Sequence, residues 1–269
     1  MIPAAFEYAR AGSVDEAVSL LGSDEDAKLL AGGHSLIPLM RLRFARPSLL
    51  VDIGRLDDLR YVRDGGERIA IGALTRHAQL VRDPLLAQHC ALIAEAAAGI
   101  GDAQVRHRGT IGGSIAHGDP ASDLATIVLT LDAELVARGP DGERTIPAAE
   151  FFAGMFETAL ARQEVLTEIR VPKVAAGVYL KVERRAQDWA TVGVAAARVD
   201  GHVQVGLTSM GPTPLRARSV EEAVAGGASP ADAAAHTADG TMPPSDVNGS
   251  GEYRAHLAQV LVQRALEQL

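Results

Sequence analysis

The sequence predicts an α+β fold in two parts, on the evidence of element order and composition. In the first part, strand, helix and strand follow at the spacing of a small α/β unit, and further strands predict a mixed sheet. The second part has strands in succession, which is typical of an antiparallel meander with helices. Only 4% of the 269 residues are aromatic against 47% hydrophobic, so small aliphatic side chains must fill the core. We expect domains 1–174 and 175–269, with the boundary inside Pro172–Gly177.

Helices and strands alternate along the first part. A capping box at Ser13–Glu16 predicts a helix through Leu21, and Pro38 is tolerated in the first turn of a helix. Further predicted helices cover Leu36–Leu42, Pro84–Ala98 and, after the cap Asp119-Pro120, Ala121–Leu131. Predicted strands cover Lys28–Ala31, Leu49–Ile53, Arg68–Gly72, the hairpin Glu134–Arg138 with Arg144–Pro147, and Val165–Val171; the first three are expected to be buried.

The second part is predicted as a meander closed by a helix. Its strands are expected over Val178–Glu183, Thr191–Val199 and Val203–Ser209. Residues 226–251 are rich in Ala, Gly, Pro, Ser and Asp, which predicts a surface connector with one short helix. From Gly251 a helix follows that carries Leu257, Val260, Leu261 and Ala265 on one face.

Charge and cysteine content exclude several classes of protein. The net charge of −8 argues against nonspecific nucleic-acid binding, which needs a basic surface. Because Cys90 is the single cysteine, the chain has no internal disulfide and cannot ligate an iron–sulfur cluster or a cysteine-bound zinc. Its apolar setting predicts a small core residue rather than a nucleophile. The chain shows neither a signal peptide nor an apolar stretch of about 20 residues, so we expect a soluble cytoplasmic protein without membrane insertion.

Two glycine pairs are the strongest functional signal. They lie in Ala31–Ser35 and Thr110–Ser114, and each puts bare backbone beside a hydroxyl side chain. Glycine has no Cβ and lets main-chain N–H groups approach a phosphate closely. The first pair also stands before a helix N-terminus, which favours anions. Together they predict two sides of one diphosphate site, although either alone could be a plain turn, and Ser35 a plain N-cap.

The common phosphate-binding motifs are absent. Neither loop has the G-x-G-x-x-G spacing of a Rossmann fold, and no Gly-Lys-Ser/Thr follows either pair. Around the second pair, four glycines alternate with apolar residues and predict a tightly wound buried loop. Arg106 and Arg108 would neutralise phosphate or form surface ion pairs. Asp123, one turn into the next predicted helix, would favour the helix dipole or accept from a ribose hydroxyl.

Both loops, and most of the chain between and after them, resemble the FAD-binding medium subunit of the molybdenum hydroxylases. This family includes the flavoprotein subunit of carbon monoxide dehydrogenase and the flavin domain of xanthine dehydrogenase. Lys28–Pro38 is similar to the family's first FAD segment and Val105–Ser114 to its second. Lys181–Ala190 and Ser250–Arg254 resemble its C-terminal domain. The resemblance covers essentially the whole chain.

The resemblance implies a noncovalent FAD site. The diphosphate and ribityl chain would lie on the two loops, Asp123 would bind a ribityl or ribose hydroxyl, and Lys181 would lie near the isoalloxazine. Trp189 would shield one flavin face, unless it fills a core. The implied cofactor-binding residues are Leu29, Leu30, Ala31, Gly32, Gly33, His34, Ser35, Ile100, Gly101, Val105, Gly109, Thr110, Ile111, Gly112, Gly113, Ser114, Asp123, Lys181 and Trp189. In a distantly related oxidase superfamily a histidine near the first loop carries FAD covalently, and His34 and His117 would do so only if this chain resembled that superfamily instead. The resemblance assigns no catalytic residue and no metal ligand to this chain.

The implied function is electron transfer within a molybdopterin-dependent hydroxylase. FAD would pass electrons from iron–sulfur clusters on a partner subunit to NAD, a quinone or oxygen. The partners would be an iron–sulfur small subunit and a molybdopterin large subunit, in a hetero-hexamer with two copies of each chain. Two alternatives stay open: a self-sufficient FAD-dependent oxidase or reductase, and a noncatalytic partner-binding protein that has lost its flavin.

Overall fold

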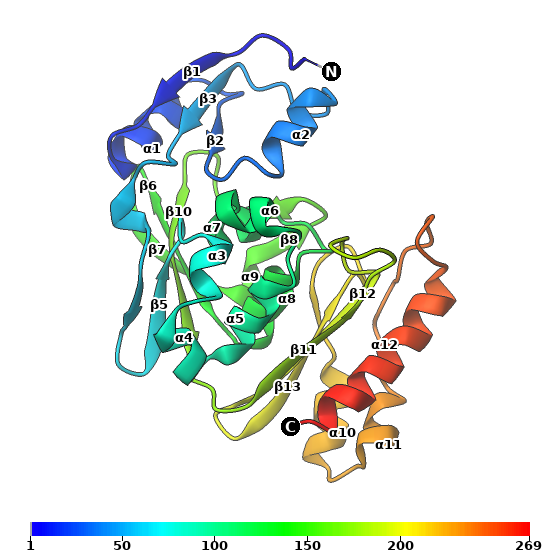
Figure 1. The fold of residues 1–269 in the computed structure, drawn as a ribbon. Coiled ribbons are helices and arrows are strands. Elements are labelled where there is room, and N and C mark those ends of the chain that lie inside the picture. The colour runs from blue at the N-terminus through cyan, green and yellow to red at the C-terminus, as the bar shows by residue number, and fades with distance from the viewer. Residues whose placement is uncertain (1) are drawn as a thin grey trace.

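Three main sheets follow one another along the molecule in the computed structural model, which describes residues 2–269 (Figure 1). They have three, five and four strands, and a short two-stranded sheet completes the set. Most helices of the middle part lie between the five-stranded and four-stranded sheets, and the last helices cover the outer face of the four-stranded sheet (Figure 1). The α+β class is confirmed.

The N-terminal unit is a parallel sheet with two helices. Its elements are β1 (Glu7–Arg10), α1 (Val14–Ser23), β2 (Lys28–Leu30), α2 (Leu36–Arg41) and β3 (Leu49–Asp52), and the strand order is β1-β3-β2. The Ser13 cap is confirmed, because Ser13 Oγ accepts from the N–H of Glu16 at 3.1 Å. The reciprocal bond of a capping box is wrong, since the Glu16 carboxylate accepts from the N–H of Gly12 at 2.7 Å and not from that of Ser13. The prediction of a buried strand at Lys28–Ala31 is wrong in its burial, since β2 forms a sheet edge and Lys28 is exposed.

The middle part is built on a five-stranded sheet in the order β4-β5-β10-β6-β7. Its strands are β4 (Val62–Asp64), β5 (Arg68–Gly72), β6 (Glu134–Gly139), β7 (Gly142–Pro147) and β10 (Val165–Pro172). Every neighbouring pair is antiparallel, so the expected mixed sheet is wrong in this detail. Arg68–Gly72 belongs to this sheet and not to the α/β unit, because a strand's periodicity does not identify its partner. The hairpin of β6 and β7 is confirmed.

Short helices cover this sheet where longer ones were predicted. They are α3 (His77–Leu80), α4 (Pro84–His89), α5 (Ala91–Ala98), α6 (Ala103–Arg108), α7 (Ile111–Ala116), α8 (Asp123–Thr130) and α9 (Ala148–Phe151), with a 3₁₀ turn at Asp57–Leu59 and strands β8 (Phe152–Gly154) and β9 (Glu157–Thr158). The continuous helix over Pro84–Ala98 is wrong, because Cys90 has φ −161° and ψ 58° and separates α4 from α5. Cys90 is nevertheless a buried core residue as predicted, and burial raises the pKa of its thiol to about 12.

The C-terminal part confirms the meander. Strands β11 (Gly177–Val182), β12 (Val192–Val199), β13 (His202–Thr208) and β14 (Leu215–Arg216) pair in chain order, and helices α10 (Arg218–Ala225), α11 (Pro230–Ala234) and α12 (Gly251–Leu266) follow. The connector contains the short helix expected there, although Ala233 and Ala234 are buried in the core. Buried residues of α12 are Arg254, Ala258, Leu261, Val262 and Ala265, whereas Leu257 and Val260 are half-buried.

Strand β12 contributes side chains to two cores, because successive side chains of a strand point to opposite faces of the sheet. Ala195, Ala197 and Val199 pack into the core of the middle part, which contains α5 and α8. Val194 and Ala196 pack on the other face, with α12. One apolar core therefore extends across the expected boundary near residue 174, and the division of the chain into 1–174 and 175–269 stays a prediction.

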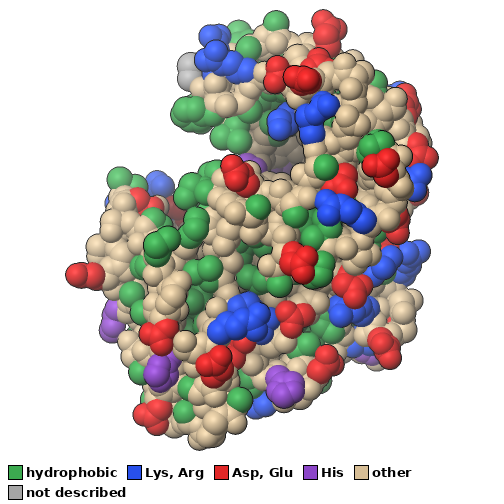
Figure 2. Space-filling model, turned by 180° about the vertical axis from the view of Figure 1, so that it is seen from behind, with side chains coloured by type: hydrophobic (Ala, Val, Ile, Leu, Met, Phe, Trp, Pro, Cys, Tyr) green, Lys and Arg blue, Asp and Glu red, His purple; other side chains and the backbone are tan. Residues whose placement is uncertain are grey.

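A hollow separates the N-terminal unit from the rest of the molecule on the side seen in Figure 2, and apolar side chains gather on both of its margins. Exposed large apolar residues include Ile37 of α2 and the loop residues Phe44, Phe156 and Trp189. Within residues 2–269, none of the helices has the length and apolar character that a membrane crossing requires.

Candidate functional site

The two glycine loops lie against each other. A Cβ added at Gly32 would collide with the carbonyl oxygen of Arg108, so only glycine allows this approach of the two backbones. A Cβ at Gly113 would lie 3.8 Å from that of Ala31. The structure thus brings together the two segments that the sequence singled out.

The first loop offers a run of backbone donors. In the part of the chain that the structure describes, none of the N–H groups from Gly32 to Leu36 donates a hydrogen bond. Gly33 has a φ of +81°, which favours glycine and turns the chain here. Ser35 stands at the N-cap position of α2, but its side chain makes no cap hydrogen bond and its backbone is already helical. Five consecutive amides and one hydroxyl are therefore available to a ligand.

The second loop differs, since its amides are already used within the protein. The predicted wound loop is in fact the end of α6 and the start of α7. Ile111 N–H donates to Thr75 O at 3.0 Å and Gly112 N–H to Ala73 O at 2.9 Å. Gly113 N–H donates to the capping hydroxyl of Thr110 at 3.2 Å. This loop offers a smooth glycine surface and hydroxyl groups rather than main-chain donors.

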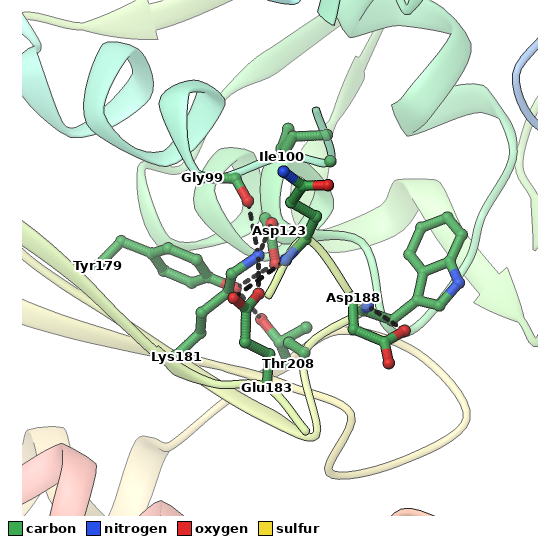
Figure 3. Close-up of polar contacts among 12 residues, drawn as sticks. Gly99, Ile100, Asp123, Tyr179, Lys181, Glu183, Asp188 and Thr208 are labelled. Atoms are coloured by element: carbon green, nitrogen blue, oxygen red, sulfur yellow. Dashed lines mark hydrogen bonds and ion pairs between the residues drawn. The ribbon is translucent and has the colours of Figure 1, made fainter. Parts of the chain in front are cut away.

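Asp123 and Lys181 form a buried ion pair beside these loops (Figure 3). Asp123 is the first residue of α8, and Ser122 is the N-cap residue before it. The predicted start of this helix after Asp119-Pro120 is therefore wrong. The Asp119 carboxylate instead accepts a hydrogen bond from Ala121 N–H. The Lys181 Nζ of β11 lies 3.2 Å from Asp123 Oδ2 and donates to Gly99 O at 2.8 Å. Their side chains are only 13% and 7% exposed, so the pair is shielded from water.

Two further groups complete this cluster, Tyr179 of β11 and Glu183, which directly follows this strand (Figure 3). Tyr179 donates its hydroxyl proton to Asp123 Oδ1 at 2.7 Å, and Glu183 Oε2 lies 3.4 Å from Lys181 Nζ. Burial raises the pKa of Asp123 above its ordinary value, although Lys181 and the Tyr179 hydrogen bond lower it. Burial and the neighbouring Asp123 raise the pKa of Tyr179 well above its ordinary value. The sequence pointed to Asp123 and Lys181 but missed Tyr179 and Glu183.

The turn at residues 99–101 is held by two basic side chains. Arg106 donates to Ile100 O at 3.0 Å and to Gly101 O at 2.8 Å, so it serves this turn rather than a surface ion pair. Lys181 donates a hydrogen bond to the carbonyl oxygen of Gly99, the first residue of this turn. Gly101 has a φ of +49°, and its backbone lies against the side chain of Val105. Arg108 is exposed.

The remaining residues singled out by the sequence differ in their exposure. Trp189 is 60% exposed, so the alternative that it fills a core is wrong. Leu29 and Leu30 are half-buried under the first loop, and His34 is exposed. The ring of His117 lies against that of Phe156, with centroids 5.1 Å apart.

His77 is a buried residue that the sequence analysis missed. A Cβ at Gly109 would lie 2.6 Å from its ring, so Gly109 is required by this packing. His77 is 4% exposed, and burial, with His34 and Arg106, lowers its pKa to about 4. No pattern around His77 distinguishes it from an ordinary surface histidine, because its burial depends on the distant second loop.

The pKa of His77 predicts an acid-sensitive fold. The unfolded chain binds a proton near pH 6.5 and the folded chain only near pH 4, so stability is lost as pH falls through this window. The expected loss is about 3 kcal/mol at its lower end. Urea unfolding at several pH values should show it, and His77→Gln should make the pH dependence shallower. An equally steep dependence in that variant would contradict the assignment.

The residues present fit a dinucleotide with a diphosphate. The first loop has unpaired amides, the second loop lies against it with its glycines, and a buried carboxylate at the start of α8 is paired with a lysine. An anion is stabilised by such amides, and a hydroxyl by such a carboxylate.

Comparison with known proteins agrees with this geometry. Residues 4–174 match the FAD binding domain in molybdopterin dehydrogenase, and residues 177–269 match the CO dehydrogenase flavoprotein C-terminal domain. The carbon monoxide dehydrogenase medium chain of Hydrogenophaga pseudoflava is 44% identical, over 99% of this chain and 97% of that one. The 6-hydroxypseudooxynicotine dehydrogenase complex subunit alpha of Paenarthrobacter nicotinovorans is 38% identical, over 99% and 95%.

Solved structures agree as well. The carbon monoxide dehydrogenase from Hydrogenophaga pseudoflava that lacks the Mo-pyranopterin moiety of the molybdenum cofactor contains a chain that superimposes with a TM-score of 0.96 at 45% identity. The match covers 100% of this chain and 98% of that one. The chain therefore belongs to the family of FAD-binding subunits of the molybdopterin dehydrogenases, the molybdenum hydroxylases.

Proposed function

We propose that this chain binds FAD noncovalently in the hollow between the N-terminal unit and the middle part, and passes electrons from a partner's iron–sulfur clusters to an external acceptor. The observation that carries the proposal is the run of unpaired amides from Gly32 to Leu36, in a loop whose Gly32 lies directly against the second loop. Bound FAD supplies a group that exchanges electrons singly or in pairs. The chain's residues bind and orient it.

Each part of the site has a proposed role. The amides of Ala31–Ser35 hold the diphosphate, with the hydroxyl of Ser35, while the surface of Gly113 lets it approach Thr110–Ser114. Asp123 accepts a ribityl or ribose hydroxyl. Lys181 gives the isoalloxazine a nearby positive charge, which favours its anionic reduced form. Exposed Trp189 covers one flavin face.

Partner subunits follow from the chain's own composition and from its relatives. One cysteine cannot ligate a [2Fe–2S] cluster, and in the described residues no group of three or more His, Cys, Asp or Glu side chains is placed to hold a metal ion. Relatives are named as medium chains or subunits. We propose an iron–sulfur small subunit and a molybdopterin large subunit as partners, two copies of each chain in a hetero-hexamer, and domains 1–174 and 175–269 in this chain.

Gly113→Val tests the cofactor site. The new side chain projects toward Ala31, into the space proposed for the diphosphate, and its Cβ would lie 2.8 Å from the hydroxyl of Thr110, so that this side chain must shift. We expect FAD affinity to fall at least about 100-fold, while the far-UV circular dichroism spectrum stays that of the wild type. Flavin fluorescence quenching measures the affinity. Undiminished FAD binding by this variant would contradict the placement of the diphosphate.

Anaerobic mixing tests the electron-transfer role. The FAD-loaded chain is mixed with a chemically reduced iron–sulfur partner subunit and flavin absorbance is followed, with Gly113→Val as the control that lacks FAD. We expect rapid bleaching of the flavin, and release of free FAD on acid precipitation. Reduction by an organic substrate or NADH alone, with no response to the partner, would favour the self-sufficient oxidase or reductase. No FAD binding at all would favour a protein that has lost its flavin.

A further inference from the structure

Tyr179 is fixed by a chain of hydroxyl groups that the proposed FAD contacts do not explain. Its hydroxyl lies 2.7 Å from Asp123 Oδ1 and 3.2 Å from Thr208 Oγ1 (Figure 3). Thr208 Oγ1 in turn lies 2.7 Å from Thr126 Oγ1 of α8, and Thr208 and Thr126 are fully buried. The hydroxyl of Tyr179 therefore lies between a buried threonine and the Asp123 oxygen that Lys181 does not contact.

Two strand glycines make room for these hydroxyl groups. A Cβ at Gly193 of β12 would collide with the Tyr179 hydroxyl and lie 2.9 Å from Thr208 Oγ1. A Cβ at Gly206 of β13 would collide with Thr130 and lie 3.0 Å from the Thr126 side chain. Glycine inside a strand costs about 0.5–1 kcal/mol relative to alanine. The strands therefore carry this destabilising residue at two positions, Gly193 and Gly206, beside the buried hydroxyl groups.

Both carboxylate oxygens of Asp123 are held from β11. Oδ1 accepts from Tyr179 and Oδ2 accepts from Lys181, whose ammonium also faces Glu183 at 3.4 Å. With both oxygens held, the carboxylate cannot rotate, and its remaining lone pairs keep one direction. A charge-assisted hydrogen bond to a ligand hydroxyl gains most when its acceptor is preorganised in this way.

We propose that Tyr179 is a positioning residue of the FAD site, whose hydroxyl fixes the Asp123 carboxylate as the acceptor for a sugar or ribityl hydroxyl of FAD. The inference rests on the proposed function and goes beyond it, because it assigns a role to a residue that need not touch the cofactor. It also makes β11 the element that prepares a side chain of α8 for binding.

The role has a pH signature. The ionised form of Asp123 is the stronger acceptor, because a hydrogen bond to a carboxylate is charge-assisted, and the groups that face it are Tyr179, Lys181 and Glu183. Burial raises the pKa of Asp123, and the Tyr179 hydrogen bond opposes this rise. FAD affinity should therefore fall as pH falls through the pKa of Asp123, and loss of the Tyr179 hydroxyl should move that fall to higher pH.

The test measures FAD affinity of the full chain by flavin fluorescence, across pH, for the wild type, Tyr179→Phe, Asp123→Asn and the double variant. We expect Tyr179→Phe to weaken FAD binding about 10- to 100-fold and to shift the pH profile upward. In the Asp123→Asn background, Tyr179→Phe should have little further effect, and the pH dependence should be absent. An equal loss in both backgrounds, or an unshifted profile, would overturn the proposal.

Tyr61→Phe is the matched control. Tyr61 also donates its hydroxyl to a buried carboxylate, Glu168, at 2.5 Å, but in the five-stranded sheet rather than beside the loops. It should lose stability and keep wild-type FAD affinity and pH profile. Thr208→Val removes the hydroxyl that contacts Tyr179 and leaves Tyr179 in place. FAD affinity should change in the same direction as in Tyr179→Phe, but by less. An unchanged FAD affinity in Thr208→Val would also contradict the proposal. If the wild type itself binds no FAD, the result contradicts the proposed function as a whole and not the role of Tyr179 alone.

Discussion

Gly32→Ala should destabilise the protein and weaken FAD binding together. The new methyl group would collide with the Arg108 carbonyl oxygen and lie 3.0 Å from the Cα of Gly109, and neither backbone atom can move without separating the two loops. Overpacking of this kind costs about 1–3 kcal/mol, and we expect the upper end because main chain is displaced on both sides. FAD affinity should fall at least about 10-fold. Urea unfolding and flavin fluorescence measure the two effects.

Gly226→Ala is the control for this substitution. Gly226 ends α10, has ordinary negative φ, and an added Cβ would meet only carbonyl oxygens at 3.4 and 3.5 Å. It should leave both stability and FAD affinity near the wild-type values. Wild-type stability in Gly32→Ala would contradict the close approach of the two loops.

Lys181→Met should have the largest effect on stability at neutral pH. It leaves Asp123, 7% exposed, and the neighbouring Glu183 without their shared cation. Breaking a buried ion pair by removing one partner costs about 3–5 kcal/mol. The burial-raised pKa of Asp123 should rise further, so the penalty should shrink as pH falls and the carboxylate takes up a proton.

Unfolding in urea at neutral pH and at about pH 5 measures this dependence. Lys173→Met is the matched control, because Lys173 pairs with Asp64 at 2.8 Å on the surface, where such a pair contributes at most about 1 kcal/mol. Equal losses in the two lysine variants would show that the Asp123–Lys181 pair is not buried in solution.

Local patterns predicted the parts of this fold that depend on neighbouring residues. The Ser13 cap before α1, the β6–β7 hairpin and the helix from Gly251 were all expected, because caps, turns and helix faces are encoded within a few residues. The break at Cys90 was not expected, since the apolar pattern continues across it. The close approach of Gly32 to the second loop was expected only from the presence of two such glycine pairs and from the family resemblance.

The arrangement of the site depends on contacts that no local pattern encodes. Asp123 and Lys181 were each expected to contact FAD, but their ion pair requires the four-stranded sheet to pack on α8, which the sequence does not specify. Tyr179 was missed because a strand tyrosine is ordinary, and only the space at Gly193 of the neighbouring strand reveals that its hydroxyl is accommodated. The unequal roles of the two glycine loops also depend on distant partners, since Ala73 and Thr75 occupy the amides of the second loop.

Hydrogen–deuterium exchange of the full chain, with and without saturating FAD, tests the central claim most directly. Without FAD, the amides from Gly32 to Leu36 should exchange fast, whereas those from Ile111 to Ser114, which have acceptors within the protein, should exchange slowly. FAD should protect the first group strongly and change the second little. Exchange in Gly32–Leu36 that stays fast when FAD is bound would contradict the account, because the diphosphate would then lie elsewhere.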